Sequence, residues 1–198
     1  MPTLSVRRML PDDLPAVVRV HQLAFRGFFL DRMGPAFLRG YYRAVLDWTG
    51  AIALVAQTSA GVQGFAVGFA DPDGFYRHFR ARRRRLIPAI LLALIRRPSL
   101  LADILRNARR VEVAQGAEPG VVELSSIATA APGRGIGAVL VQAFCAEAFG
   151  QGAVAVALTT DRDDNGVVRD FYERHGFKHV GHESRGERVL CCYRLARP

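Results

Sequence analysis

The stretch SSIATAAPGRGIGAVLVQAF, residues 125–144, joins a β-rich segment to an amphipathic helix through a cluster of glycines. The segment before the cluster, VVELSSIAT (121–129), has the β-branched residues and length of a strand. Within the cluster, Gly133, Gly135 and Gly137 carry no side chains that would cover the first N–H groups of the helix. These unpaired donors and the helix dipole attract anions. The joint therefore indicates a phosphate site, although glycines in such a turn also permit close packing.

The composition suits one globular domain over residues 1–198, because the chain is 198 residues long and 50% hydrophobic. Its net charge of +9 is carried by arginine, since Lys178 is the only lysine. No helix-turn-helix, zinc-finger or RNA-recognition signature accompanies these arginines. We therefore expect no nucleic-acid partner and favour an anionic small molecule.

Targeting and cysteine patterns indicate a reducing compartment. The first ten residues lack the apolar core of a signal peptide, and the longest apolar run, LIPAILLALI (86–95), is shorter than the roughly 20 residues of a membrane span. Cys145, Cys191 and Cys192 form no C-x-x-C pair. We expect a cytoplasmic protein without a metal site.

The pattern of apolar residues predicts alternating strands and helices, with a hairpin formed by two consecutive strands near the middle of the chain. The predicted strands are 4–10, 51–58, 62–70, 121–129, 153–160 and two more on either side of Arg185 and Gly186. The predicted helices are 12–25, 34–48, 135–149 and 165–174. A basic helical segment occupies about 75–110, with breaks near Pro88 and Pro98.

The glycine joint fits neither common nucleotide motif. A dinucleotide fingerprint needs G-x-G-x-x-G early in a βαβ unit, and a P-loop needs Gly-Lys-Ser/Thr. Downstream, however, the order strand, turn, short helix and H-G-F in LTTDRDDNGVVRDFYERHGFKHVG (158–181) resembles the GNAT superfamily of N-acetyltransferases. The residues that fit the family's N-x-x-A/V-x-x-F/L-Y-x-x-x-G-F pattern are Asn165, Val168, Phe171, Tyr172, Gly176 and Phe177. In the family's Q/R-x-x-G-x-G/A pattern the first slot holds Pro132.

This resemblance implies a single α/β (α+β) domain with a mixed, mostly antiparallel sheet flanked by helices and with the helical insertion at about 75–110. It also implies an acetyl-coenzyme A (acyl-coenzyme A) donor and transfer of the acetyl group to an amine of a small molecule, directly within a ternary complex. The residues that the resemblance places at coenzyme A are Ile127, Ala128, Thr129, Gly133, Arg134, Gly135, Ile136, Gly137, Ala138, Asn165 and Phe171.

Two residues are candidates for proton transfer. Family similarity implies that Tyr172 protonates the departing coenzyme A thiolate and that Glu123 removes a proton from the amine. Both residues also have ordinary alternatives. Tyr172 fits a half-buried tyrosine with a hydrogen-bonded hydroxyl, and Glu123 fits a strand glutamate that faces solvent or pairs with an arginine.

The acceptor pocket of the family is built by the first two helices, the hairpin and the last strands. The residues that this places at the acceptor are His21, Phe25, Phe28, Phe29, Arg32 and Tyr41. At helical spacing, His21 and the phenylalanines are also typical of a core stripe.

The basic insertion leaves alternatives open. It fits a helical cap on the protein's own sheet, a contact in a homodimer or beside the acceptor pocket, or a helix lying on an anionic membrane surface. We expect no membrane contact. The alternative functions are a noncatalytic module that binds acyl-coenzyme A and a partner-binding protein that acts through the insertion.

Overall fold

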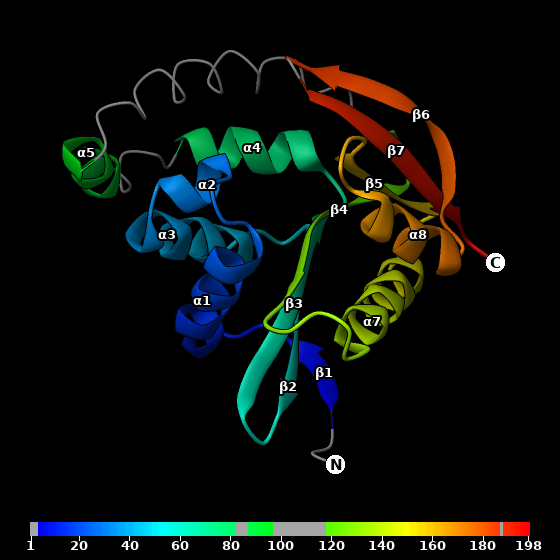
Figure 1. Cartoon of the computed structure of the whole chain (residues 1–198), viewed down its shortest axis with the longest axis horizontal. Helices are drawn as coiled ribbons and strands as arrows, with labels where there is room; N and C mark the ends of the chain where they lie inside the picture. The colour runs from blue at the N-terminus through cyan, green and yellow to red at the C-terminus, as the bar shows by residue number, and fades with distance from the viewer. Residues whose placement is uncertain (1–3, 82–86, 97–117, 187) are drawn as a thin grey trace.

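A seven-stranded sheet of order β1-β2-β3-β4-β5-β7-β6 forms the centre of the computed structural model, which describes residues 4–81, 87–96, 118–186 and 188–198 (Figure 1). The strands are β1 (Ser5–Arg8), β2 (Ala51–Thr58), β3 (Gly61–Phe69), β4 (Val121–Thr129), β5 (Ala155–Asp161), β6 (Lys178–Arg185) and β7 (Arg188–Ala196). β4 and β5 run parallel, whereas the other neighbouring pairs are antiparallel. The predicted mixed, mostly antiparallel sheet is confirmed, as is the predicted hairpin of β2 and β3.

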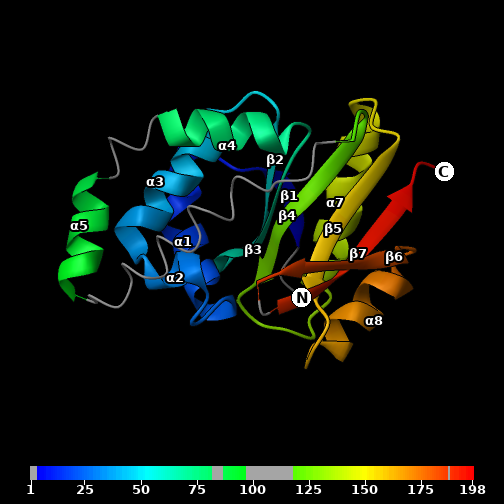
Figure 2. The same cartoon turned by 90° about the horizontal axis from the view of Figure 1, so that it is seen from above.

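Helices cover both faces of the sheet (Figure 2). One face carries α1 (Leu14–Ala24), α2 (Phe29–Arg32), α3 (Pro35–Leu46) and α4 (Pro72–Ala81), with α1 preceded by the 3-10 turn η1 (Pro11–Asp13). The other face carries α7 (Ile136–Gly150) and α8 (Gly166–Arg174). A separate hydrophobic core lies on each face of the sheet, and β2 and β3 are therefore buried on both sides.

Two glycines of β3 let α7 approach the sheet closely. A Cβ at Gly64 would lie 2.8 Å from the Ala128 carbonyl oxygen and 2.9 Å from Leu140 Cδ1. A Cβ at Gly68 would collide with the Phe144 ring. Because successive residues of a strand alternate faces, both glycines lie on the α7 side. This contact fixes the N-terminus of α7 beside the end of β4.

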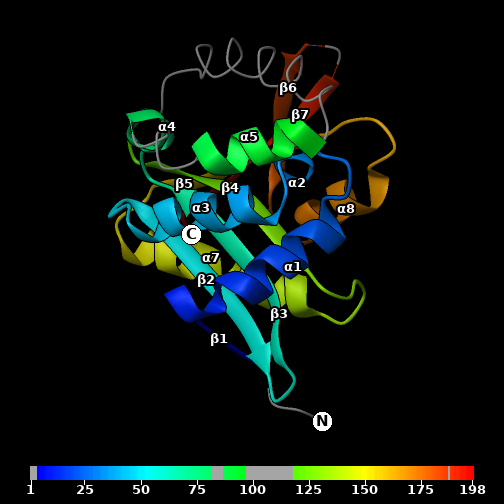
Figure 3. The ribbon, with the colours of Figure 1, turned by 90° about the vertical axis from the view of Figure 1, so that its left-hand side faces the viewer.

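The predicted insertion is partly described. Most of α4 and all of α5 (Ile87–Arg96) lie within it, and α5 lies outside α3, farther from the sheet (Figure 3). Pro88 stands in the first turn of α5, where its missing N–H has no helical partner to lose. The rest of the segment, 82–86 and 97–110, lies outside the described residues. In the described part of the chain, no helix combines the length and apolarity needed to cross a bilayer.

Candidate functional site

The glycine joint forms an exposed loop that ends in a bare helix N-terminus. Gly133 and Gly135 have φ of +79° and +75°, the left-handed region, and a Cβ at either position would meet nothing within 4 Å. Gly135 is the N-cap of α7 and makes no side-chain capping bond. Arg134 between them is exposed. The loop therefore presents open backbone, as the sequence predicted.

The first turn of α7 leaves its N–H groups available. The N–H of Val139 donates to the Gly135 carbonyl oxygen at 3.2 Å and is the first to enter the helical pattern. The preceding N–H groups, those of Ile136, Gly137 and Ala138, belong to the positions that no helical carbonyl satisfies. Three convergent donors on a helix dipole suit a phosphate group. The residues present thus fit the pyrophosphate of coenzyme A.

Two further predicted residues border this turn. A Cβ at Gly137 would lie 3.5 Å from Phe171 Cζ, so the Phe171 ring from α8 covers the side of the turn. The Asn165 side-chain amide donates to Thr160 Oγ1 at 2.7 Å and to the Asp161 carbonyl oxygen at 3.3 Å. Asn165 therefore holds the β5–α8 connection in place, which positions α8 beside α7.

β4 and β5 diverge next to the loop. In the described part of the chain, their pairing covers only Val121–Glu123. The Ala130 N–H donates to the Gln63 carbonyl oxygen at 2.8 Å. Alternation along the antiparallel β3–β4 ladder then turns the N–H groups of Ile127 and Thr129 toward the open edge. The same alternation turns the Ala128 N–H toward β3, so Ala128 presents no donor to this opening.

Glu123 stands at the last β4–β5 pair, opposite Ala157, where the two strands begin to separate. Burial raises the pKa of its carboxyl above the ordinary value, against the charge of Arg185 and an interaction with the Ser125 hydroxyl, which lower it. Carboxylates that accept protons in catalysis commonly have a pKa raised by burial.

Buried tyrosines and an arginine surround this carboxyl. The Tyr76 hydroxyl interacts with those of Tyr41 and Ser125, and burial raises the pKa of both tyrosines. The Arg185 guanidinium approaches from β6, where its Nε donates to Glu183 at 2.8 Å, and its charge interacts with that of Glu123. We call Glu123, Tyr41, Tyr76, Ser125 and Arg185 the Glu123 cluster.

Most of the Glu123 cluster could not be predicted from the sequence. Ser125 follows Glu123 by two residues and thus shares its strand face, which the sequence pattern could have indicated. Tyr76 and Arg185 lie far from Glu123 in sequence, and no local pattern connects them with it. Of the alternatives stated for Glu123, pairing with an arginine holds in part, because its charge interacts with that of Arg185, whereas a glutamate facing solvent does not, because the residue is not exposed.

Tyr172 lies on the other face of the sheet, in the core between α8, β7 and the start of β6. It is 6% exposed, and its ring contacts those of Phe177 and Tyr193. Burial raises its pKa well above the ordinary value, so the hydroxyl stays protonated. A protonated hydroxyl is the state that a general acid needs.

The H-G-F sequence is explained by a helix cap. Gly176 has a φ of +85°, its N–H donates to the Glu173 carbonyl oxygen at 3.0 Å, and the Phe177 N–H donates to the Tyr172 carbonyl oxygen at 3.1 Å. This is the Schellman arrangement, in which a left-handed glycine ends the helix. It folds Phe177 back onto Tyr172 and fixes the tyrosine ring.

The predicted acceptor residues separate into two groups. His21 is 3% exposed, its Nδ1 lies 2.7 Å from the Tyr42 hydroxyl, and it packs on Phe25 and Phe65. His21 therefore lies in the core, in agreement with the alternative of a core stripe, and does not form part of a pocket wall. Tyr41 is buried within the Glu123 cluster.

The loop between α1 and α2 carries the more exposed group. Phe28 is 44% exposed, and the Arg188 guanidinium of β7 lies 5.3 Å from the centroid of its ring. Arg188 is held by Asp161 of β5 through a 2.6 Å ion pair. The loop thus meets the β6–β7 hairpin on the face that carries Glu123. Phe29 and Arg32 follow in α2 and are half-buried.

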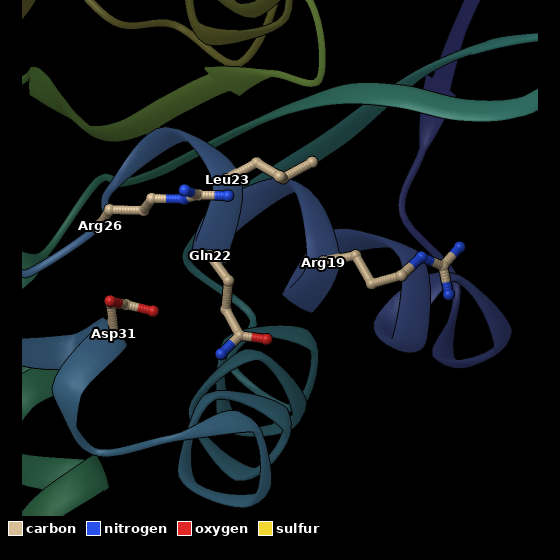
Figure 4. A pocket seen from close by; sticks show the side chains of 5 residues that line it. All are labelled: Arg19, Gln22, Leu23, Arg26 and Asp31. Atoms are coloured by element: carbon tan, nitrogen blue, oxygen red, sulfur yellow. The ribbon is translucent and has the colours of Figure 1, made fainter.

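A separate pocket lies on the outer side of α1 (Figure 4). Its lining residues are Arg19, Gln22, Leu23, Arg26 and Asp31. The first three are spaced for one face of α1, away from the face on which His21 packs against β3, and Arg26 follows the end of the helix. None of the predicted site residues lines this pocket.

We expect His21 to destabilise the folded protein in acid. Burial lowers its pKa to about 4 from 6.5, so the folded chain keeps the imidazole neutral where the unfolded chain protonates it. The contribution of the neutral imidazole to the free energy of unfolding is fully present above about pH 6.5. Up to about 3 kcal/mol of it is lost as the pH drops to about 4. Urea unfolding across this range measures the loss. His21→Asn, which cannot titrate, should remove that part of it, and equal losses in both proteins would contradict the assignment.

Comparison with known proteins agrees with this geometry. A profile described as the acetyltransferase (GNAT) family matches residues 17–177. No curated protein matches the chain in sequence. Among solved structures, a protein described as a GNAT-family acetyltransferase from Desulfovibrio desulfuricans is 19% identical, with a TM-score of 0.66 over 98% of this chain and 99% of that one.

Two further structures show the same fold. An N-acetyltransferase from Staphylococcus aureus is 15% identical, with a TM-score of 0.62 over 98% of each chain. A PaiA N-acetyltransferase from Thermoplasma acidophilum, solved with coenzyme A, is 12% identical, with a TM-score of 0.59 over 96% of this chain and 98% of that one. With the profile match spanning most of its length, the chain belongs to the GNAT acetyltransferase family, whose members use acetyl-coenzyme A as the acetyl donor.

Proposed function

We propose that the protein transfers an acetyl group from acetyl-coenzyme A to an amine of a small molecule, directly and within a ternary complex. The observation that carries this proposal is the position of Glu123, a buried carboxyl at the vertex where β4 and β5 separate. The backbone N–H groups that we assign to donor binding are at the end of β4 and the start of α7.

The glycine loop and the first turn of α7 hold the pyrophosphate in this proposal. The donors are the N–H groups of Ile136, Gly137 and Ala138, with Gly133 and Gly135 leaving room and Arg134 free to approach from solvent. Bound acetyl-coenzyme A supplies the thioester. One of the two backbone N–H groups turned toward the opening, that of Ile127 or that of Thr129, donates to its carbonyl oxygen. One such donor contributes about 3 kcal/mol where negative charge develops.

Glu123 takes up the proton of the amine. An amine with a pKa near 10.4 needs about 4.6 kcal/mol to become neutral at about pH 7. A carboxyl with a raised pKa accepts that proton more readily than an ordinary glutamate, because burial destabilises its charged form. Arg185 limits this rise, because its positive charge favours the ionised carboxylate.

Tyr172 supplies a proton to the leaving sulfur from the other side of the sheet. Its raised pKa keeps the hydroxyl protonated throughout the range in which the amine reacts. Asn165 and Phe171 take part by positioning: Asn165 ties the β5–α8 turn, and Phe171 places α8 against the first turn of α7.

Direct transfer is supported by the state of two thiols. Burial raises the pKa of Cys145 to about 11 and also raises that of Cys192. The thiolate is the nucleophilic form of cysteine, so both side chains are poor acetyl carriers. The state of these two thiols favours direct attack of the acceptor amine on the thioester.

The acceptor enters from the face that carries Glu123. Phe28 and the neighbouring Phe25, Phe29 and Arg32 border the entrance from the α1–α2 side, and Tyr41 lines its floor. Aromatic residues at such an entrance favour an amine attached to an apolar or planar group.

An acceptor screen tests the proposed function. Purified protein is incubated with acetyl-coenzyme A and a panel of small amines, and thiol release is followed with the protein's own three cysteines subtracted. Release that depends on one class of amine, with one acetylated product per thiol, supports the proposal. Stoichiometric binding of acetyl-coenzyme A without turnover on any amine would instead favour a noncatalytic binding module.

Replacing Glu123 with glutamine should change the pH profile as well as the rate. We expect kcat/KM to fall by about a hundredfold near pH 7. The defect should shrink as the pH approaches the pKa of the amine, because a neutral amine needs no base. Initial rates from about pH 6 to about pH 9 give the profile.

Glu118→Gln is the matched control, because Glu118 is an exposed glutamate that pairs with Arg194. It should leave the profile unchanged. If the pH profiles of the wild type and Glu123→Gln have the same shape, Glu123 is not the base.

A further inference from the structure

A cluster of three potential metal ligands lies on the β6–β7 hairpin. A ring nitrogen of His179, a ring nitrogen of His182 and the Cys191 thiol all lie within 4.8 Å of one another. The two imidazole rings have their centroids 4.6 Å apart. The hairpin forms one end of the sheet and is next to α8 (Figure 1).

A β-bulge brings the two histidines together. Residues three apart in a regular strand point to opposite faces. In β6, however, His179 pairs with Tyr193 while Gly181 pairs with Cys192, so Val180 is an extra residue in the ladder. Gly181 has a φ of +153°, which side chains rarely adopt. The extra residue reverses the alternation, and both imidazoles lie on one face.

The third ligand comes from the neighbouring strand. His182 pairs directly with Cys191 in the β6–β7 register, so their side chains share that face. Tyr193 lies on the same face, with its ring centroid 5.4 Å from that of His179. Cys192 is adjacent to Cys191 and therefore points to the opposite face, where the charges of Glu183 and Arg185 influence it.

The three side chains are available for coordination. The Cys191 thiol is free, and the residue is 1% exposed, whereas both histidines are exposed. Neither imidazole hydrogen-bonds to any residue that the structure describes; their contacts there are with aromatic rings. A buried thiol beneath two exposed imidazoles leaves one side of the cluster open to water.

The donor set identifies the class of metal. Two imidazole nitrogens and one thiolate suit a borderline-soft divalent ion, while magnesium and calcium prefer oxygen. Zinc is about 2.0–2.1 Å from nitrogen and about 2.3 Å from sulfur, so its tetrahedral ligands lie about 3.4–3.6 Å apart. The potential ligand atoms of the three side chains must therefore move about 1 Å closer to one another. Rotation of the exposed imidazoles provides this movement.

We propose that His179, His182 and Cys191 bind one Zn²⁺, with water as the fourth ligand. The ion joins β6 to β7 on the face opposite Glu183 and Arg185, and it releases the thiol proton on binding. Cysteine spacing in the sequence predicts no metal site, because the proposed site depends on the bulge and the strand register.

Zinc titration of the metal-free chain, prepared without a histidine tag, tests the proposal. Calorimetry should give one Zn²⁺ per chain for the wild type, with at least about a hundredfold weaker binding in His179→Gln and His182→Gln. Both substituted residues are exposed, so these variants should fold. Cys191→Ser should lose the site, and Cys192→Ser, which alters the neighbouring thiol on the opposite face, should keep it.

Cobalt provides a second readout of the same variants. Co²⁺ bound through a thiolate gives a charge-transfer band in the near ultraviolet, which Cys191→Ser should lose and Cys192→Ser should retain. The proposal is overturned if the wild type shows no saturable zinc binding. It is equally overturned if His179→Gln and His182→Gln bind zinc as tightly as the wild type, or if the cobalt band follows Cys192.

Discussion

Tyr172→Phe should lower kcat by about a hundredfold to ten-thousandfold, the range typical for loss of a general acid. The KM for acetyl-coenzyme A should change little, because the hydroxyl acts on the leaving sulfur and not on the bound ground state. Phenylalanine keeps the ring contacts with Phe177 and Tyr193, so the fold should persist. Steady-state kinetics with both substrates varied measures the effect.

Tyr193→Phe is the matched control for this variant. Tyr193 is a second buried tyrosine in the same core, and its hydroxyl donates to Glu173 at 2.8 Å. Removing that hydroxyl should alter stability by about 1 kcal/mol and leave kcat nearly unchanged. If both variants lose the same activity, or if Tyr172→Phe keeps the wild-type kcat, the hydroxyl of Tyr172 has only a structural role.

Gly137→Val should weaken acetyl-coenzyme A binding about thirtyfold or more, which corresponds to loss of one charge-assisted hydrogen bond of about 2 kcal/mol. The valine methyl groups would stand beside the phosphate donors in the first turn of α7. Its Cβ would meet the Phe171 ring at 3.5 Å, an ordinary contact, so the helix should still form. Calorimetric titration with acetyl-coenzyme A and with coenzyme A gives the affinities.

Gly150→Val at the last residue of the same helix is the control, since a Cβ there would meet nothing within 4 Å. Gly135→Val is less informative. Its φ of +75° disfavours a β-branched residue, so that variant would reshape the loop as well as crowd it. Equal affinities in wild type and Gly137→Val would exclude the first turn of α7 as the phosphate site.

The sequence predicted well those features whose backbone conformation depends on residues nearby in the chain. The glycines of the joint adopt the left-handed backbone that leaves donors uncovered, and Gly176 ends α8 in a Schellman cap. Both are consequences of residue types within a few positions of each other. The strand and helix order followed from hydrophobic periodicity in the same local way.

The arrangement of side chains around the site depended on contacts between distant segments. Tyr76, Glu123 and Arg185 come from α4, β4 and β6, and their proximity follows from the order of the sheet. His21 has the same spacing as a pocket residue would have, and only the packing of Tyr42 and Phe65 around it places it in the core.

The same distinction applies to two of the bulges in the described part of the sheet. Ser125 is an extra residue between the β3–β4 pairs Val67–Ser126 and Gly68–Leu124, and Val180 is an extra residue in the β6–β7 ladder. Each reverses which face the following side chains occupy. Sequence alone determined the family and the bare helix N-terminus, because backbone conformation and periodicity are local. Tertiary structure decided the Glu123 cluster and the histidine–cysteine cluster, because strand register depends on partners far along the chain.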